Sequence, residues 1–235
     1  MREELSDLVA AVRGALAAAQ AMGAIYDEPR GLAASSNAEP PEGPVVAASL
    51  ADVRAGLGEC TRCSLCQGRS QIVFGVGDPH ADLLIVGEAP GEQEDLRGEP
   101  FVGAAGEMLD RMLENVLGLA RSSVYICNVI KCRPPKNRAP LPEEIATCRP
   151  FLEAQIAAVA PKVMLVLGGV AYKALFETDE GITRARGHWR DWQSIPTLPT
   201  FHPAYLLRQP ADKRLVFADL QAVRVRYDAL GGRRL

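Results

Sequence analysis

The stretch Leu83-Leu-Ile-Val-Gly87, followed directly by Glu-Ala-Pro-Gly91, decides the fold. Its first five residues carry no polar side chain, which predicts a short strand that is buried on both faces. Three further apolar runs of this kind follow, at residues 124–130, 163–168 and 197–201. Several such runs in one chain are typical of a parallel sheet.

Stretches with helical periodicity separate these apolar runs, at residues 105–117, 142–160, 169–176 and 215–227. Strands that alternate with helices predict an α/β fold, in which helices cover both faces of a parallel sheet. Ligands bind such sheets beyond the carboxyl ends of the strands. Polar residues stand at three of these ends, so we expect one crevice that contains the loop after Gly87, Asn128 and His202.

The first 47 residues differ in composition from the rest of the chain. Apolar residues recur at helical spacing within residues 3–22, which predicts one helix. Residues 27–47 hold four prolines among Ala, Ser, Asn and Glu, a composition typical of a flexible linker. We therefore expect an N-terminal helical extension with its linker at residues 1–47, and one folded domain at residues 48–235.

Composition and charge narrow the class of protein. The 235 residues are 48% hydrophobic and 23% charged, as in a soluble globular protein, with a formal net charge of −3. Residues 1–59 hold four Arg against nine Asp and Glu, which leaves 22 basic against 20 acidic residues in the remainder. That mildly basic remainder is compatible with a face that binds DNA phosphates. No apolar run reaches membrane-spanning length and the N-terminus lacks a signal-peptide pattern, so we expect a cytoplasmic protein.

Six cysteines in a cytoplasmic chain indicate metal ligation, catalysis or burial rather than disulfides. Cys127 lies inside an apolar run and is expected to be a small core residue, and we also expect Cys66 to bind no metal. A C-x-x-C pair with two distant partners can close a four-thiolate site for zinc or for an iron–sulfur cluster, and spacing does not choose between them. The four cysteines concerned are Cys60, Cys63, Cys132 and Cys148.

Four further motifs occur together with these cysteines, in order along the chain. They are Gly87-Glu-Ala-Pro-Gly-Glu-Gln-Glu-Asp95, Glu99-Pro-Phe-Val-Gly103, Asn128-Val-Ile-Lys-Cys-Arg-Pro-Pro135 and His202-Pro-Ala-Tyr-Leu-Leu-Arg208. Over roughly residues 52–228 the chain resembles the family-four uracil-DNA glycosylases. The resemblance implies a three-layer α/β/α sandwich around a four-stranded parallel sheet. It also implies a [4Fe–4S] cluster on the four cysteines.

The implied activity is excision of uracil from DNA by hydrolysis of its N-glycosidic bond, which leaves an abasic site and initiates base excision repair. The transition state of such a reaction resembles an oxocarbenium sugar with an anionic leaving base, and the base must first flip into a pocket. We expect Phe101 to stack on the base. Asn128 carries both the donor and the acceptor that uracil N3–H and O4 require. The resemblance assigns His202 to uracil O2, where negative charge develops.

The sequence leaves open which residue activates the water molecule. The better-known family-one enzymes carry an aspartate where this chain has Ala89, which has no polar group. Glu88 is our first candidate for the functional carboxylate, since a carboxylate can orient water or stabilise a cationic sugar. We expect Glu94 to shape the pocket wall and to help exclude the methyl group of thymine.

We expect the segment after His202 to contact DNA. Tyr205, Leu206 and Leu207 are candidates to fill the space that a flipped base leaves, although the two leucines also fit a core. The expected phosphate contacts near this segment are Arg208, Lys213 and Arg214. A second basic set surrounds the expected cluster loop: Lys131, Arg133, Lys136, Arg138 and Arg149.

The expected partner is DNA that contains uracil, bound by a monomer, and residues 1–47 are a candidate docking segment for a repair or replication protein. Two other functions remain open on the sequence. One is a non-catalytic iron–sulfur protein that binds DNA or senses lesions, an alternative that Ala89 keeps open. The other is a nucleic-acid enzyme stabilised by zinc.

Overall fold

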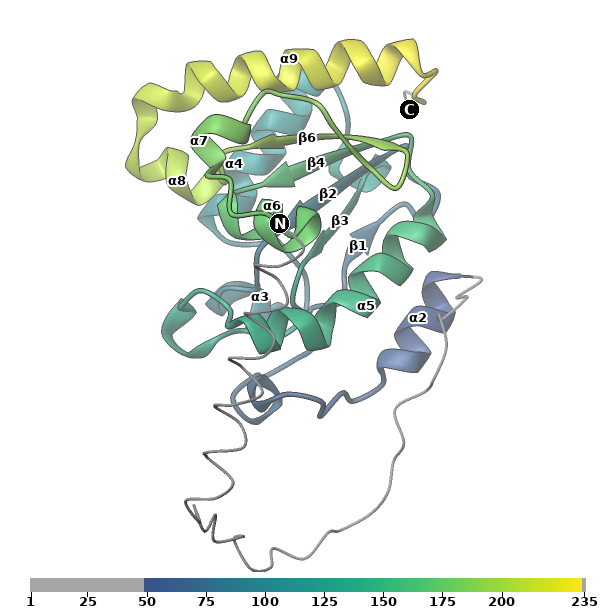
Figure 1. Cartoon of the computed structure of the whole chain (residues 1–235), viewed down its shortest axis with the longest axis vertical. Helices are drawn as coiled ribbons and strands as arrows, with labels where there is room; N and C mark the ends of the chain where they lie inside the picture. Colours follow the sequence, from purple (N-terminus) through teal and green to yellow (C-terminus); the bar gives the residue numbers. More distant parts are fainter. Residues whose placement is uncertain (1–48, 234–235) are drawn as a thin grey trace, which may run out of the picture. The chain divides into compact units, whose positions relative to one another are not determined.

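The computed structural model describes residues 49–233, so the helix and linker expected within residues 1–47 lie outside the described residues. Within this range the chain forms a six-stranded sheet in the order β1-β3-β2-β4-β6-β5 (Figure 1). The strands are β1 (Val76–Gly77), β2 (Leu83–Gly87), β3 (Tyr125–Asn128), β4 (Val163–Leu167), β5 (Arg190–Trp192) and β6 (Ile195–Thr200). Strands β3, β2, β4 and β6 run parallel, which confirms the four parallel strands expected from the sequence.

Two short antiparallel strands at the sheet edges were not predicted. Strand β1 pairs with β3, and β5 pairs with β6. Strand β1 has two residues and β5 has three, so neither is long enough to show a periodic pattern. A two-residue turn with positive φ at Gln193 and Ser194 joins β5 to β6, the turn geometry that suits a tight hairpin. This pairing also makes β6 begin at Ile195, earlier than the apolar run indicated.

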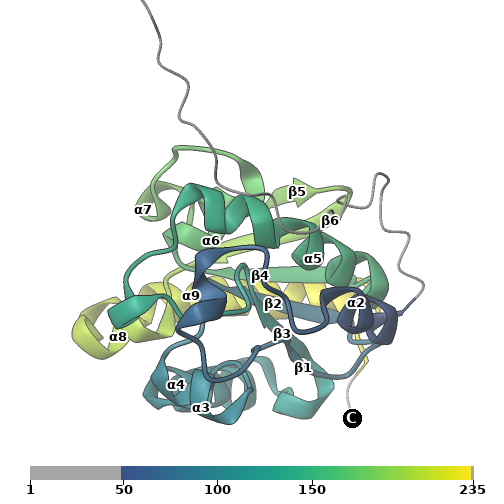
Figure 2. The ribbon, with the colours of Figure 1, turned by 90° about the horizontal axis from the view of Figure 1, so that it is seen from below.

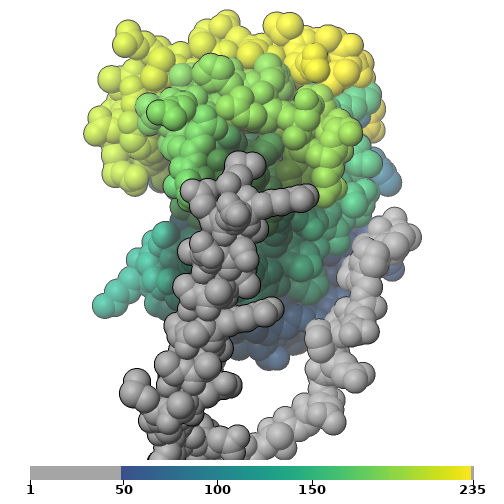
Figure 3. All heavy atoms as spheres, viewed as in Figure 1, coloured from purple at the N-terminus to yellow at the C-terminus, as the bar shows by residue number. Residues whose placement is uncertain are grey.

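Helices lie on both faces of the sheet, as Figures 1 and 2 show. The first four along the described chain are α2 (Leu50–Leu57), α3 (Glu92–Arg97), α4 (Ala104–Met112) and α5 (Pro142–Val159). They are followed by α6 (Gly169–Phe176), α7 (Ile182–Ala185), α8 (Pro203–Arg208) and α9 (Lys213–Ala229). Helix α4 continues as a π-helical turn to Leu117, where Gly118 with φ of 65° ends it. In the space-filling view, α8 and α9 form the upper, yellow part of the molecule (Figure 3).

The alternation of side chains along each strand produces two hydrophobic cores. Leu83 and Ile85 of β2 point into the core that contains α4 and α9. Leu84 and Val86 point into the opposite core, with α5 and α6. Because both faces are covered, every residue of β2, β3 and β4 is buried, which explains why these strands are apolar except for Asn128 at the end of β3. The architecture is the expected three-layer α/β/α sandwich.

A smaller cluster attaches the segment that carries the first cysteines. Val53 and Leu57 of α2 pack with Phe74 and with Ala154 of α5. The side chain of Ser49 accepts a hydrogen bond from the backbone N–H of Asp52, 3.2 Å away, and so caps the start of α2. No helix within residues 49–233 has the length and apolarity that crossing a bilayer requires.

Candidate active site

A cavity of about 420 Å³ lies beyond the carboxyl ends of β2, β3 and β6. Three strand ends contribute to it because parallel strands point their carboxyl ends to one edge of the sheet. The cavity is lined by six of the residues singled out in the sequence, Glu88, Ala89, Glu94, Phe101, Asn128 and His202, and also by Arg208. The tertiary structure therefore brings together residues that lie up to 120 positions apart in the chain (88 to 208).

Phe101 forms one wall of the cavity and is held in an unusual backbone conformation. Its φ of 54° is left-handed, and its side chain is 6% exposed. The ring stacks on the imidazole of His202, with ring centroids 5.5 Å apart and 27° between the planes. A Cβ atom on Gly106 would lie 1.9 Å from the Phe101 carbonyl oxygen, so only glycine fits there. Such strain persists where surrounding structure maintains it, commonly at functional sites.

Asn128 ends β3 and is only 2% exposed. Its Oδ1 atom has no hydrogen-bond partner among the described residues. A buried amide oxygen without a partner is costly, because it has lost its water without gaining a donor. Gly87 provides the space beside it, since a Cβ there would lie 2.3 Å from Asn128 Oδ1 and 2.6 Å from Phe101 Cζ. The amide is thus available to a ligand that brings an N–H group.

His202 caps the N-terminus of α8. Its Nδ1 atom accepts a hydrogen bond from the backbone N–H of Ala204, 3.1 Å away. Burial, together with the charge of Arg208 and against the opposing charge of Glu94, lowers the pKa of His202 to about 4. The imidazole is therefore neutral near pH 7, with its proton on Nε2, because Nδ1 must carry the lone pair. That tautomer supplies one N–H donor.

Two carboxylates line the cavity and have different surroundings. Glu88 follows β2 and is half-buried, and burial raises the pKa of its carboxyl group. Glu94 accepts hydrogen bonds from the backbone N–H groups of Gly91, Val102 and Gly103, at 3.1, 2.9 and 3.0 Å. Glu94 therefore joins the loop after β2 to the loop that carries Phe101. Of the two, only Glu88 has its carboxylate free of such backbone bonds among the hydrogen bonds of residues 49–233.

The four cysteines proposed as ligands come from three separate segments. Cys60 and Cys63 follow α2, Cys132 follows β3, and Cys148 lies in α5. Burial raises the pKa of Cys132 to about 11, and the thiols of Cys148 and Cys63 add to the effect. Burial likewise raises the pKa of Cys148, with contributions from Cys60 and Cys63. These mutual effects indicate that the four thiols lie near one another, as a shared site requires.

The surroundings of the thiols supply positive charge. Arg69 donates hydrogen bonds to Cys132 Sγ, 3.3 Å away, and to the Cys60 carbonyl oxygen, 2.7 Å away. Within residues 49–233 no three His, Cys, Asp or Glu side chains are grouped closely enough to hold one metal ion. Thiolates are ligands both of zinc and of iron–sulfur clusters, so four thiols with the Arg69 guanidinium beside one of them are a donor set that suits either kind of site.

A family model described as the uracil DNA glycosylase superfamily matches residues 74–221. This chain belongs to that superfamily. It is 41% identical over 184 residues to a type-4 uracil-DNA glycosylase of Sulfurisphaera tokodaii, an overlap of 75% of this chain and 84% of that protein. A type-4 enzyme of Thermotoga maritima is 44% identical over 167 residues, 69% of this chain and 86% of that protein. A type-5 uracil-DNA glycosylase of Pyrobaculum aerophilum is 31% identical over 147 residues, 55% of this chain and 64% of that protein.

The basic residues of this superfamily member fall into different environments. Arg208, Lys213 and Arg214 are exposed, at the end of α8 and the start of α9. Lys131, grouped in the sequence with the surface cations, is 1% exposed, so it cannot meet a DNA phosphate. The prediction for Lys131 was wrong because the sequence shows a charged side chain between Ile130 and Cys132 without showing that its segment enters the core.

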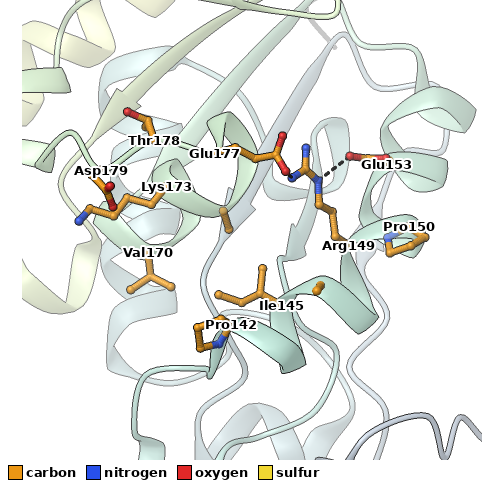
Figure 4. A pocket seen from close by; sticks show the side chains of 12 residues that line it. Pro142, Ile145, Arg149, Pro150, Glu153, Val170, Lys173, Glu177, Thr178 and Asp179 are labelled. Carbon is orange, nitrogen blue, oxygen red and sulfur yellow. Dashed lines mark hydrogen bonds and ion pairs between the residues drawn. The ribbon is translucent and has the colours of Figure 1, made fainter. Parts of the chain in front are cut away.

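Arg149 also lies away from the cavity of the glycosylase domain. It faces an open hollow of about 780 Å³ between α5 and α6, which Figure 4 shows with its lining side chains. There the guanidinium bonds Glu153 at 2.7 Å and pairs with Glu177. Because two carboxylates already engage it, Arg149 is a poor candidate for a phosphate contact. The hollow has an apolar floor that includes Ile145 and Val170, and it contains none of the residues singled out for catalysis.

Several residues that sequence reasoning did not single out for the pocket of the glycosylase also line it, among them Pro134, Asn137, Arg138 and Ala204. Lys136 and Asn137 have positive φ values of 54° and 55°, a turn that folds this loop toward the cavity. Arg138 is held by two hydrogen bonds to the buried carboxylate of Glu144, at 2.8 and 2.6 Å. The one signal of this turn in the sequence was Asn137, since asparagine tolerates a left-handed backbone better than most residues.

Proposed function

We propose that this protein is a uracil-DNA glycosylase that flips uracil out of DNA and hydrolyses its N-glycosidic bond, leaving an abasic site. The observation that carries the proposal is the buried Oδ1 of Asn128, which has no partner in the described chain, in the cavity that Phe101 and His202 also line. Uracil brings the missing donor, N3–H, and offers O4 to the other half of the amide. Cytosine presents the reverse pattern and leaves the same amide unsatisfied.

The bound base is oriented by three side chains. Phe101 offers a ring face, Asn128 reads the N3–O4 edge, and His202 directs its Nε2–H toward O2. As the glycosidic bond breaks, negative charge accumulates on the leaving base and its O2 oxygen. A neutral donor held in place by the Ala204 hydrogen bond stabilises that charge without reorganising. Removal of one such donor costs about 10²–10³-fold in rate in comparable sites.

Glu88 is our candidate for the group that acts on water or on the cationic sugar. Its carboxylate borders the cavity, and Ala89 next to it has no polar group. A carboxylate there can accept a proton from water or stabilise the oxocarbenium ion electrostatically. The carboxylate of Glu94 accepts hydrogen bonds from three backbone N–H groups. We therefore propose that Glu94 shapes the pocket wall and does not transfer a proton.

We propose that Cys60, Cys63, Cys132 and Cys148 bind a [4Fe–4S] cluster. When bound, the cluster cross-links the segment after α2 to the loop between β3 and α5, and hydrolysis requires no electron from it. The relatives' type-4 designation and the proximity of the four thiols support this assignment. The cluster thereby holds the loop that contributes Pro134, Asn137 and Arg138 to the cavity.

We assign the DNA contacts to the end of α8 and the start of α9. Leu206 is buried and belongs to the core, whereas Leu207 is 43% exposed and is our candidate for the wedge that fills the vacated base position. The Tyr205 hydroxyl donates to Asp212, 2.7 Å away, and so braces this corner. Exposed Arg208, Lys213 and Arg214 are the candidate phosphate contacts.

The oligomeric state, the cellular compartment and the protein partners of the enzyme are also part of the proposal. We propose that it acts as a monomer in the cytoplasm, where cysteines stay reduced and available to iron. We also propose that residues 1–47 form a separate extension that binds a repair or replication partner, since their proline-rich composition differs from that of the domain.

A base-release assay tests the activity. Oligonucleotides that contain uracil, hypoxanthine or thymine are incubated with iron-loaded protein, and free base and abasic sites are quantified. We expect release of uracil and none of thymine, and a loss of release in the Asn128→Ala variant with the fold intact. Tight binding to uracil DNA without release at enzyme excess would favour a non-catalytic lesion sensor instead.

A further inference from the structure

Lys131 is a charged side chain inside the core. It is 1% exposed, and its Nζ atom donates a 2.6 Å hydrogen bond to the backbone oxygen of Asn128. Burying an ammonium group costs several kcal/mol unless it is paired and hydrogen-bonded. The position of this cation therefore needs a negative partner.

No carboxylate supplies that partner, since none of the ion pairs found within residues 49–233 includes Lys131. Lys131 directly precedes Cys132, which is 7% exposed, so the buried ammonium belongs to the same buried segment as a proposed cluster ligand. Burial raises the pKa of Cys148 and of Cys127, and the charge of Lys131 opposes that rise. Cys127 is a fully buried core residue, so the partner of interest is the site that Cys148 shares with Cys132.

Lys131 also contacts Asn128, the residue whose side-chain amide is proposed to bind uracil. The strand end that carries Asn128 is held to β2 by two further bonds, from the N–H of Val129 to the Gly87 oxygen at 2.9 Å and from that of Ile130 to the Glu88 oxygen at 3.3 Å. The Lys131 ammonium binds the backbone carbonyl of Asn128, which directly precedes these two N–H donors. Lys131 thus stands next to a proposed cluster ligand in the chain, and its side chain contacts the residue that reads the base.

We propose that Lys131 is a positioning residue that links the negative charge of the four-thiolate cluster to the alignment of the Asn128 amide. The proposal rests on the proposed function and on the cluster assignment. Four thiolates outweigh the positive charge of the iron–sulfur core, so the loaded site is anionic and keeps the ammonium buried. The ammonium in turn fixes the end of β3, and with it the direction of the side chain that binds uracil.

Two substitutions separate the charge of Lys131 from its hydrogen bond. Lys131→Met keeps length and apolar packing and removes both. Lys131→Gln removes the charge and keeps an N–H donor. Lys173→Met is the matched control, because Lys173 is exposed on α6 and lines only the hollow between α5 and α6.

The first measurement is the midpoint potential of the cluster, together with iron content and visible absorption. A nearby cation stabilises the reduced cluster, so both Lys131 variants should shift the potential to more negative values, whereas Lys173→Met should leave it unchanged. An unshifted potential in Lys131→Met with full iron content would overturn the charge link. Loss of iron in both Lys131 variants, with α/β secondary structure retained and Lys173→Met fully loaded, would support it.

The second measurement is the affinity for free uracil together with the single-turnover excision rate. We expect Lys131→Met to lose about tenfold to a hundredfold in both, the worth of a hydrogen bond to a charged group, and Lys131→Gln to recover part of that loss. Unchanged uracil affinity in an iron-loaded Lys131→Met protein would overturn the alignment role. If the unsubstituted protein releases no uracil, the proposed function fails, whereas the potential and uracil-binding measurements still decide the role of Lys131.

Discussion

The Nδ1 atom of His202 accepts the backbone N–H of Ala204 at 3.1 Å, and this contact determines which nitrogen of the imidazole carries the proton. With Nδ1 used as an acceptor, the proton lies on Nε2. The ring of Phe101 stacks on the same imidazole, 5.5 Å between centroids. One backbone hydrogen bond therefore specifies the donor that the candidate pocket presents to a base.

The first prediction concerns the pH dependence that arises from His202. Its pKa is lowered to about 4 by burial and by Arg208, so the ring is neutral at all pH values above that range. Protonation below it converts Nδ1 from an acceptor to a donor and breaks the Ala204 contact. We expect nitrogen NMR of the labelled imidazole to show the neutral Nε2–H tautomer at pH 7 and at pH 5.5. A ring that titrates near its ordinary value of 6.5 would contradict this assignment.

The second prediction concerns Glu88. Burial raises the pKa of its carboxyl group above the usual 4.5, and a group that acts as a base must be ionised. The single-turnover rate should fall as the pH decreases through that raised pKa, and Glu88→Gln should remove this limb and reduce the rate by about 10²–10⁴-fold.

The stability of the same variant provides an independent check. A carboxylate whose folded pKa is raised destabilises the folded state once it ionises, that is, above its unfolded pKa. Glu88→Gln should therefore unfold at the same or a higher denaturant concentration at pH 7. A large loss of stability would indicate that Glu88 is structural.

The third prediction tests the close approach of three residues at the pocket. In Gly87→Ala the new Cβ would lie 2.3 Å from Asn128 Oδ1 and 2.6 Å from Phe101 Cζ, so one of the two must move. We expect affinity for free uracil and the excision rate to fall by at least tenfold, the scale of one hydrogen bond to a buried amide. Gly56→Ala is the control, because nothing lies within 4 Å of a Cβ there. It should leave excision unchanged and stabilise α2 by about 0.5–1 kcal/mol.

The fourth prediction distinguishes ligand cysteines from the others. Cys132→Ala should lose the brown colour, iron and solubility, because one of four cluster ligands is missing. Cys66→Ala should retain all three, since Cys66 lies in a short 3₁₀ segment and is not among the four proposed ligands. Iron analysis and visible absorption of both purified variants provide the measurement. A colourless Cys66→Ala protein would show that Cys66 binds the cluster in place of one of the four cysteines proposed here.

Much of the fold was predictable because it depends on local patterns. Uninterrupted apolar runs such as Leu83–Gly87 require burial on both faces, and this requirement implies helices on both sides of a parallel sheet. The edge strands β1 and β5 were not predicted, because strands of two or three residues are too short to show an alternating pattern of apolar and polar residues. Their pairing depends on neighbours that the sequence does not show to be adjacent.

By itself the sequence determined which chemical groups are present and at which strand ends they stand: Asn128, His202 and the carboxylates after Gly87. Only the tertiary structure decided their states, because these depend on distance and burial. It placed Lys131 in the core rather than on the surface and engaged Glu94 with three backbone N–H groups. It also left the Oδ1 of Asn128 without a partner in the described chain. Charge and hydrogen bonding act over a few ångströms in space, and residue spacing along a chain does not record those distances.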